Sequence, residues 1–387
     1  MKNVVIPRIA VCLAGFCAFL NLYAPQALLP SLAHEFGVGA AAISTIMTAS
    51  TLAIALTAPF TGAVADVLGR KRVITAAMIA IVVPTTFVGL AADVHQLVVW
   101  RFIQGLLLPP IFAVTVAYIG DEWPPSQVTS IAGIYTAGSS LGGFSGRFLS
   151  GLLADLFGWR AAFLVLAALT LAGAVGIALM LPRERKFVPS IGIMSSIVQM
   201  VRHLQNPQLV ATYAVGFGVL FNFIATFTYL SFHLAAPPYN FSPTLLGAVF
   251  VTYLVGVAAA PTAGRAVGRF GRRKFTLWVI AIWVCGIALT LASSIALIML
   301  GLALCAGCGI LCQTVSTGYV TTTAKAGRSS AVGLYVTSFY FGGSVGAFVP
   351  GLAYEHGGWP ACVELVVGIL TIMALIVMLT WTTPRRA

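Results

Sequence analysis

The chain has 387 residues, of which 59% are hydrophobic and 8% are charged. A soluble domain carries about a quarter of its residues as charges, so this composition excludes a soluble globular protein and favours a chain surrounded mostly by lipid. The formal net charge of +12 would suggest a nucleic-acid partner in a soluble protein. Here the basic residues lie mainly between apolar segments, so no nucleic-acid partner is expected.

Twelve apolar segments follow one another along the chain. Each is long enough for a membrane-spanning helix, which needs about 20 residues because backbone groups in lipid must hydrogen-bond within the segment. The predicted helices are residues 9–30, 43–65, 73–91, 97–119, 129–152, 160–181, 208–235, 244–266, 275–293, 295–318, 329–353 and 360–382. Stretches such as Ala161–Met180 are apolar at odd and even positions alike, unlike a β-barrel strand. The sequence therefore predicts an all-α membrane protein with twelve transmembrane helices.

Basic residues are distributed unevenly between the two ends of these helices. If both termini are cytoplasmic, only Arg101, Arg147 and Arg160 of the 21 Lys and Arg residues fall outside the inner loops and inner helix ends. An excess of Lys and Arg on the cytoplasmic side is the rule for membrane proteins. We therefore expect a multi-pass protein of the cell inner membrane with both termini in the cytoplasm.

The second half of the chain repeats the first. Residues 132–159 recur at 332–359, and the block from Pro59 to Arg70 recurs from Pro261 to Arg272. This duplication predicts two pseudo-symmetric six-helix bundles, residues 1–181 and 208–387, with a substrate cavity between them. Residues 182–207 are expected to form a cytoplasmic linker whose amphipathic segment, Ile191–Leu204, lies on the membrane surface.

The loop after the second predicted helix carries a distinctive motif. It reads Gly62-Ala-Val-Ala-Asp66-Val-Leu-Gly69-Arg70-Lys71-Arg72, which closely resembles the signature loop of the major facilitator superfamily. Gly69 permits a tight turn. The alternative is an ordinary basic loop that obeys the charge rule. The corresponding loop of the second half has Gly268 in place of Asp66.

This resemblance implies a transporter with two six-helix bundles that alternates between inward-facing and outward-facing states. It also implies that Asp66 and Arg70 belong to a cytoplasmic charge network that holds the outward-facing state. Asp121, just past the fourth helix, is expected to join that network. Such a loop would control conformational exchange and not bind substrate.

The fourth predicted helix contains an arginine inside the span. Its sequence, Leu97-Val-Val-Trp-Arg101-Phe-Ile-Gln104-Gly105, is similar to a superfamily motif whose arginine is linked to proton coupling. A charge inside a span is costly, so Arg101 should face a cavity or a partner. The alternative is a guanidinium that extends to the outer interface.

The fifth predicted helix is rich in glycine. Its run from Gly138 to Arg147 resembles the antiporter motif of proton-coupled exporters but lacks the proline of that motif. By this resemblance, Gly142, Gly143 and Gly146 take part in coupling. The alternative is close helix packing, and the recurrence of these glycines in the eleventh helix fits it equally.

Polar residues inside four helices are candidate substrate contacts, because helices one, four, seven and ten line the cavity in this superfamily. The candidates are Asn21, Tyr23, Gln26, Gln104, Asn222, Tyr229 and Gln313. The alternative for each is a hydrogen bond between helices. Arg147 either binds an anionic substrate group or pairs with Asp155 or Glu364. Helix one lacks the carboxylate that many drug exporters place there.

The resemblance implies a secondary active transporter, similar to the twelve-helix drug:proton antiporters and arabinose-efflux-type permeases, that exports a small organic molecule in exchange for protons. The alternative is a facilitator or symporter that imports an organic anion, suggested by Arg101, Arg147 and the missing carboxylate. An enzyme would need a catalytic cluster or an appended soluble domain, and neither is found, so no enzymatic activity is expected.

No cofactor or metal is expected either. Cys305, Cys308 and Cys312 share a helix face without His or carboxylate neighbours, which favours packing over a metal site. Because no nucleotide-binding motif is present, an ion gradient or the substrate itself should supply the energy. The expected partners are the substrate, protons and membrane lipid, and the expected state is a monomer.

Overall fold

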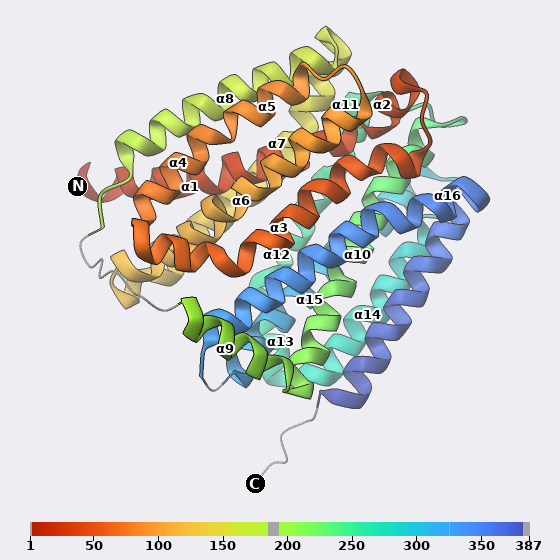
Figure 1. Cartoon of the computed structure of the whole chain (residues 1–387). Helices are drawn as coiled ribbons and strands as arrows, with labels where there is room; N and C mark the ends of the chain where they lie inside the picture. Colours follow the sequence, from red (N-terminus) through yellow and green to blue (C-terminus); the bar gives the residue numbers. More distant parts are fainter. Residues whose placement is uncertain (1, 185–192, 325, 382–387) are drawn as a thin grey trace. The chain divides into compact units, whose positions relative to one another are not determined.

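The computed structural model describes residues 2–184, 193–324 and 326–381, and over these residues the chain is helical apart from short connections, with no strand. The all-α prediction is therefore confirmed for the described chain (Figure 1). Ile191 of the predicted amphipathic segment lies outside the described residues, as do the basic residues Arg185, Lys186, Lys325, Arg385 and Arg386.

The chain forms two compact units. The first comprises Met1–Val38, Thr45–Ile193 and Leu234–Phe250, and the second comprises Gly39–Ser44, Met194–His233 and Val251–Ala387. By its contacts, the start of α3 therefore groups with the second unit and α11 groups with the first.

The first unit is built mainly from the helices of the first sequence repeat. They are α1 (Lys2–Tyr23), the 3-10 helix η1 (Ala24–Ala27), α2 (Leu29–Phe36), α3 (Ala40–Leu68), α4 (Arg70–Ala80), α5 (Val82–Gly89), α6 (Val94–Glu122), α7 (Pro125–Phe157), α8 (Trp159–Met180) and, from the second repeat, α11 (Pro243–Val249). Helix α1 packs on α6, α7 and α8. The predicted first span, residues 9–30, is thus α1 and η1 followed by the start of α2.

The second unit holds the remaining helices. They are α9 (Ile193–Leu204), α10 (Pro207–Ala235), η2 (Phe250–Thr252, which begins at the end of the first unit), α12 (Tyr253–Ala259), η3 (Ala260–Thr262), α13 (Ala263–Phe270), α14 (Arg272–Leu289), α15 (Ile295–Thr323) and α16 (Arg328–Thr380). The predicted span 244–266 is therefore several short helical pieces from α11 to α13. The linker segment that the structure describes is the helix α9.

Each of the twelve predicted spans corresponds to a helical stretch. By length and hydropathy alone, nine stretches in the described chain qualify as spans. Helix α7 and helix α14, which begins with Arg272, Arg273 and Lys274, do not reach that threshold. Helix α16 counts as one stretch but bends at Gly358, whose φ of 63° and ψ of −156° are not helical. Gly158, the repeat counterpart of Gly358, likewise has a positive φ of 85° and separates α7 from α8.

Glycines bring α1 and α7 into backbone contact. A Cβ atom on Gly138, Gly142 or Gly146 would overlap a backbone carbonyl oxygen of α1, at Cys12, Phe16 and Leu20 respectively. In the second repeat, Gly342 and Gly346 of α16 meet the carbonyls of Phe217 and Phe221 of α10 in the same way. Small residues four apart allow this approach because helices in lipid associate by close packing. The glycines therefore have a packing role in both repeats.

Two carboxylates at equivalent positions cap helices of the other repeat. Asp155, near the end of α7, accepts a hydrogen bond from the backbone N–H of Thr244 at 2.8 Å, in the first turn of α11. Glu355 of α16 accepts one from the backbone N–H of Ala41 at 3.0 Å, in the first turn of α3. A Cβ on Gly151 or Gly351, four residues before each acid, would overlap the backbone of the capped segment. Each repeat thus uses a Gly-x-x-x-acid segment to hold the start of a helix from the other.

Candidate functional site

The interior of the first unit contains a fully buried arginine. Arg101 of α6 has no exposed side-chain surface, so its guanidinium does not extend to an interface. It donates hydrogen bonds to the backbone carbonyls of Asn21 at 2.9 Å and Leu22 at 2.6 Å, and to the hydroxyl of Ser50 at 2.9 Å. It also donates to the amide oxygen of Gln104. The partners are neutral dipoles, and none is a carboxylate.

The carbonyls that Arg101 binds lie where α1 breaks. In a regular helix the carbonyl of Asn21 would accept from the backbone N–H of residue 25, but Pro25 has none. The chain continues from Tyr23 into the 3-10 helix η1, and Ser150 of α7 donates to the carbonyl of Ala24 at 2.6 Å. An unpaired backbone group in lipid is costly, so these side chains from α6 and α7 stabilise the break.

Polar side chains extend the Arg101 cluster across the unit. Gln104 donates to Thr85 of α5 at 2.8 Å and to the side-chain oxygen of Asn21 at 3.2 Å. Asn21 in turn donates to Thr170 of α8 at 2.8 Å. All of these residues are buried. We call this set, Asn21, Ser50, Thr85, Arg101, Gln104 and Thr170, the polar cluster.

Arg147 of α7 occupies a second buried position. Its guanidinium carbon lies 4.0 Å from the ring centre of Tyr23 and 4.3 Å from that of Phe250. It donates to the side chain of Gln26 at 2.8 Å and to the carbonyl of Gly143 at 2.9 Å. The predicted candidates Tyr23, Gln26 and Arg147 therefore meet, with the charge held between aromatic faces.

The two acids predicted as possible partners of Arg147 have different surroundings. Asp155 accepts from the backbone and hydroxyl of Thr244, and Glu364 of α16 is exposed. The contacts described for Arg147 are with Gln26, Gly143 and the rings of Tyr23 and Phe250, and its pairing with Asp155 or Glu364 stays a prediction.

The signature loop brings its three charged candidates together. A guanidinium nitrogen of Arg70 lies 2.7 Å from a carboxylate oxygen of Asp121 and 3.5 Å from one of Asp66. Gly69, with a φ of 93°, makes the turn between α3 and α4. Positive φ at this angle is strained for residues with a Cβ, so a glycine is required there.

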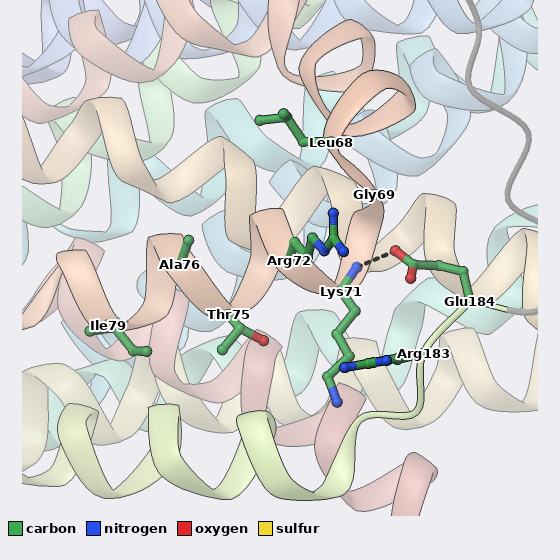
Figure 2. A pocket seen from close by; sticks show the side chains of 9 residues that line it. All are labelled: Leu68, Gly69, Lys71, Arg72, Thr75, Ala76, Ile79, Arg183 and Glu184. Carbon is green, nitrogen blue, oxygen red and sulfur yellow. Dashed lines mark hydrogen bonds between the residues drawn. The ribbon is translucent and has the colours of Figure 1, made fainter.

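A fourth charged residue at this loop was not predicted. Glu184, which follows α8, accepts a hydrogen bond from the backbone N–H of Lys71 at 2.6 Å and so caps α4 (Figure 2). The only sequence signal was an acid in an otherwise basic linker. Lys71, Arg72 and Arg183 line a pocket of about 650 Å³ beside it.

The candidates in the second unit lie apart from one another. Asn222 of α10 donates to the sulfur of Met373 at 3.4 Å, and its side-chain oxygen is buried with no hydrogen-bond partner. Tyr229 donates to the carbonyl of Ala347. Gln313 of α15 borders a groove of about 340 Å³ whose other lining residues are Thr314, Thr317, Gly318 and Thr321. The structure therefore brings no two of these three predicted contacts together by a hydrogen bond.

Comparison with known proteins is consistent with this architecture. The family model of the Major Facilitator Superfamily matches residues 11–236 and 209–387. The inner membrane transport protein YnfM of Escherichia coli strain K12 is 30% identical over 365 residues, covering 94% of this chain and 87% of that protein.

Two solved transporters share the fold. The human organic anion transporter MFSD10 has a TM-score of 0.71 at 18% identity, covering 96% of this chain and 99% of the other. The nucleoside transporter NupG has a TM-score of 0.75 at 15% identity, covering 99% and 100%. Because the family model spans both sequence repeats and a relative at 30% identity covers most of the chain, the protein belongs to the Major Facilitator Superfamily.

Proposed function

We propose that this membrane transporter exports a small organic molecule across the inner membrane in exchange for protons. Two six-helix repeats, residues 1–181 and 208–387 joined by residues 182–207, would alternate access to the substrate. In this proposal the protein is a monomer with both termini in the cytoplasm, as the positions of its Lys and Arg residues favour.

The observation that carries the proposal is the environment of Arg101. This arginine stands in the motif that resembles the proton-coupling motif of the superfamily, and its buried charge is balanced only by the dipoles of neutral groups. Such a charge raises the free energy of any second positive charge nearby, since Coulomb interactions are strong in a low-dielectric interior. We therefore propose that Arg101 has the coupling role that the motif resemblance implies.

The proton would be carried at the helix ends. None of the nine Asp and Glu residues, all of which the structure describes, is buried: Glu35, Asp66, Asp93, Asp121, Glu122, Asp155, Glu184, Glu355 and Glu364. We therefore propose that Asp66 and Asp121, which share Arg70, exchange protons as the charge network opens and closes.

The test is transport by purified protein in proteoliposomes with an imposed pH gradient, using a panel of radiolabelled organic cations, neutral compounds and anions. An acidic lumen should accelerate substrate uptake, because protons leave as substrate enters. Acceleration by an acidic exterior would indicate symport, and equal rates under both gradients would indicate a facilitator. Either result would contradict antiport.

A second candidate function is import of an organic anion. It is favoured by two buried cations of the first unit: Arg101, which donates to neutral groups, and Arg147, which lies against the ring of Tyr23 and donates to Gln26. MFSD10, named an organic anion transporter, shares the fold. The variants Arg101→Gln and Arg147→Gln should then lose uptake of anionic substrates, and unchanged uptake in the double variant would refute this candidate.

A further inference from the structure

The pocket beside the signature loop combines a basic rim with an apolar wall. Lys71, Arg72 and Arg183 supply the cations, and Leu68, Ala76 and Ile79 supply apolar surface (Figure 2). Residues 72, 76 and 79 follow one another at helical spacing along α4, so charge passes into apolar surface along one face. Leu68 and Ile79 are each more than half exposed, as expected for side chains that face lipid.

The three cations of this pocket have no anionic partner within the described residues. The ion pairs among the described residues of the chain join Arg70 to Asp66 and Asp121, and Arg160 to Glu35. Glu184 is the one carboxylate in the pocket lining, and its bonded oxygen accepts from the backbone N–H of Lys71. Its hydrogen bond therefore caps the helix and leaves the ammonium group and both guanidinium groups available.

We propose that this pocket binds the headgroup of an acidic phospholipid. The phosphate would lie among Lys71, Arg72 and Arg183, and an acyl chain would run along the wall formed by Ala76 and Ile79. Basic pockets at the ends of membrane helices recognise anionic headgroups in this way. A free phosphate would use the same cations but gain nothing from the apolar wall. The proposal needs only a membrane-embedded protein and is independent of the direction and proton coupling of transport.

The duplication of the chain provides a matched control. Arg273 and Lys274 occupy the positions of Lys71 and Arg72 in the second signature loop. The variants Lys71→Gln/Arg183→Gln and Arg273→Gln/Lys274→Gln each remove two positive charges, the first from the pocket and the second from the corresponding loop of the second repeat. A lipid held only by general surface charge would respond to both alike.

The experiment is native mass spectrometry of detergent-purified protein titrated with phosphatidylglycerol or phosphatidylcholine, with circular dichroism as the check on folding. Wild type should retain phosphatidylglycerol preferentially. Each removed charge should weaken retention roughly fivefold, so the Lys71/Arg183 variant should lose about twenty-five-fold and the Arg273/Lys274 variant far less.

Three results would overturn the proposal: equal retention by wild type and the Lys71/Arg183 variant, equal losses in both variants, or displacement of the lipid by an equal concentration of inorganic phosphate. If the Lys71/Arg183 variant does not fold, a salt titration of wild type replaces it. The preference for phosphatidylglycerol should disappear at high ionic strength because salt screens charges at a protein surface. A preference that persists would refute the charge-based site.

Discussion

Asn21 and Asn222 occupy equivalent positions in the two repeats but have different surroundings. Asn21 bonds to Thr170 and Gln104 within the polar cluster, whereas Asn222 contacts Met373 and leaves its side-chain oxygen unpaired. In helices of equal length, α6 and α15, Leu302 stands at the position of Arg101. Among the described residues, the two buried charged side chains, Arg101 and Arg147, therefore both belong to the first repeat.

The two signature loops differ in the same direction. Arg70 pairs with Asp66 and Asp121, whereas its counterpart Arg272 lies over the ring of Tyr319, 4.3 Å from its centre, and donates to Thr322 at 3.4 Å. Neither acid has an acidic counterpart in the second repeat, which carries Gly268 at the position of Asp66 and Thr322, near the end of α15, at the position of Asp121. The two repeats thus share the glycines at helix contacts and the helix caps, but they differ in the charged residues of their signature loops.

The largest effect is expected where the repeats differ most. Arg101→Met removes the donors to the carbonyls of Asn21 and Leu22 while keeping a long side chain, so both carbonyls lose their partner. Each unpaired buried carbonyl costs about 1–3 kcal/mol, and we expect a large drop in thermal stability and loss of transport. Leu302→Met, at the equivalent position, should cost under about 1.5 kcal/mol. Similar melting temperatures for the two variants, measured in detergent, would refute the account of the break.

The next effect concerns the charge network and appears in transport, not in stability. Asp66→Asn keeps the Arg70–Asp121 pair but weakens the latch, so we expect folded protein whose transport is slowed by about tenfold, a change of about 1.4 kcal/mol. Arg272→Gln in the second loop should slow transport less, because that arginine has no carboxylate partner in the part of the chain that the structure describes. If Asp66→Asn transports at the wild-type rate in proteoliposomes, the charged residues of the loop only set the orientation of the helices in the membrane.

A smaller effect tests the shared packing. Gly142→Ala and Gly342→Ala place a methyl group against the carbonyls of Phe16 and Phe217, so each should cost about 1–3 kcal/mol of stability. Gly143→Ala is the control, since its Cβ would lie 3.6 Å from its nearest neighbours, Arg147 and Tyr23, an ordinary contact. If all three variants unfold at the wild-type temperature, close packing is not the role of these glycines.

The smallest effect concerns the two helix caps. Asp155→Ala and Glu355→Ala should each cost about 0.5–2 kcal/mol, toward the lower end because both carboxylates are exposed. Asp93 caps α6 within its own repeat, through the backbone N–H of Gln96 at 2.8 Å. Asp93→Ala should match their loss of stability but leave transport rates unchanged, whereas the caps between repeats should alter those rates. Equal transport rates in all three variants would show that the caps formed by Asp155 and Glu355 contribute only to stability.

Hydropathy, the repeat and the signature motif were sufficient to predict the helical spans and the candidates around Arg70, because these depend on local composition and family resemblance. The polar cluster was only partly predictable. Thr85 and Thr170 also bond to carbonyls of their own helices, at Ile81 and Leu166, which is how an isolated threonine in an apolar segment ordinarily behaves. Nothing local marks them as partners of Asn21, since those contacts depend on how α5 and α8 pack on α1.

The break in α1 also bears on how the chain enters the membrane. Pro25 leaves the carbonyl of Asn21 without its usual donor, and the guanidinium that satisfies it belongs to Arg101, 80 positions after Asn21. During synthesis this carbonyl therefore lacks its hydrogen-bond donor until α6 inserts. We expect the helices from α1 to α6 to reach their final packing together. Chains halted before Val94 should remain sensitive to protease near Pro25, and chains extended past Glu122 should become resistant.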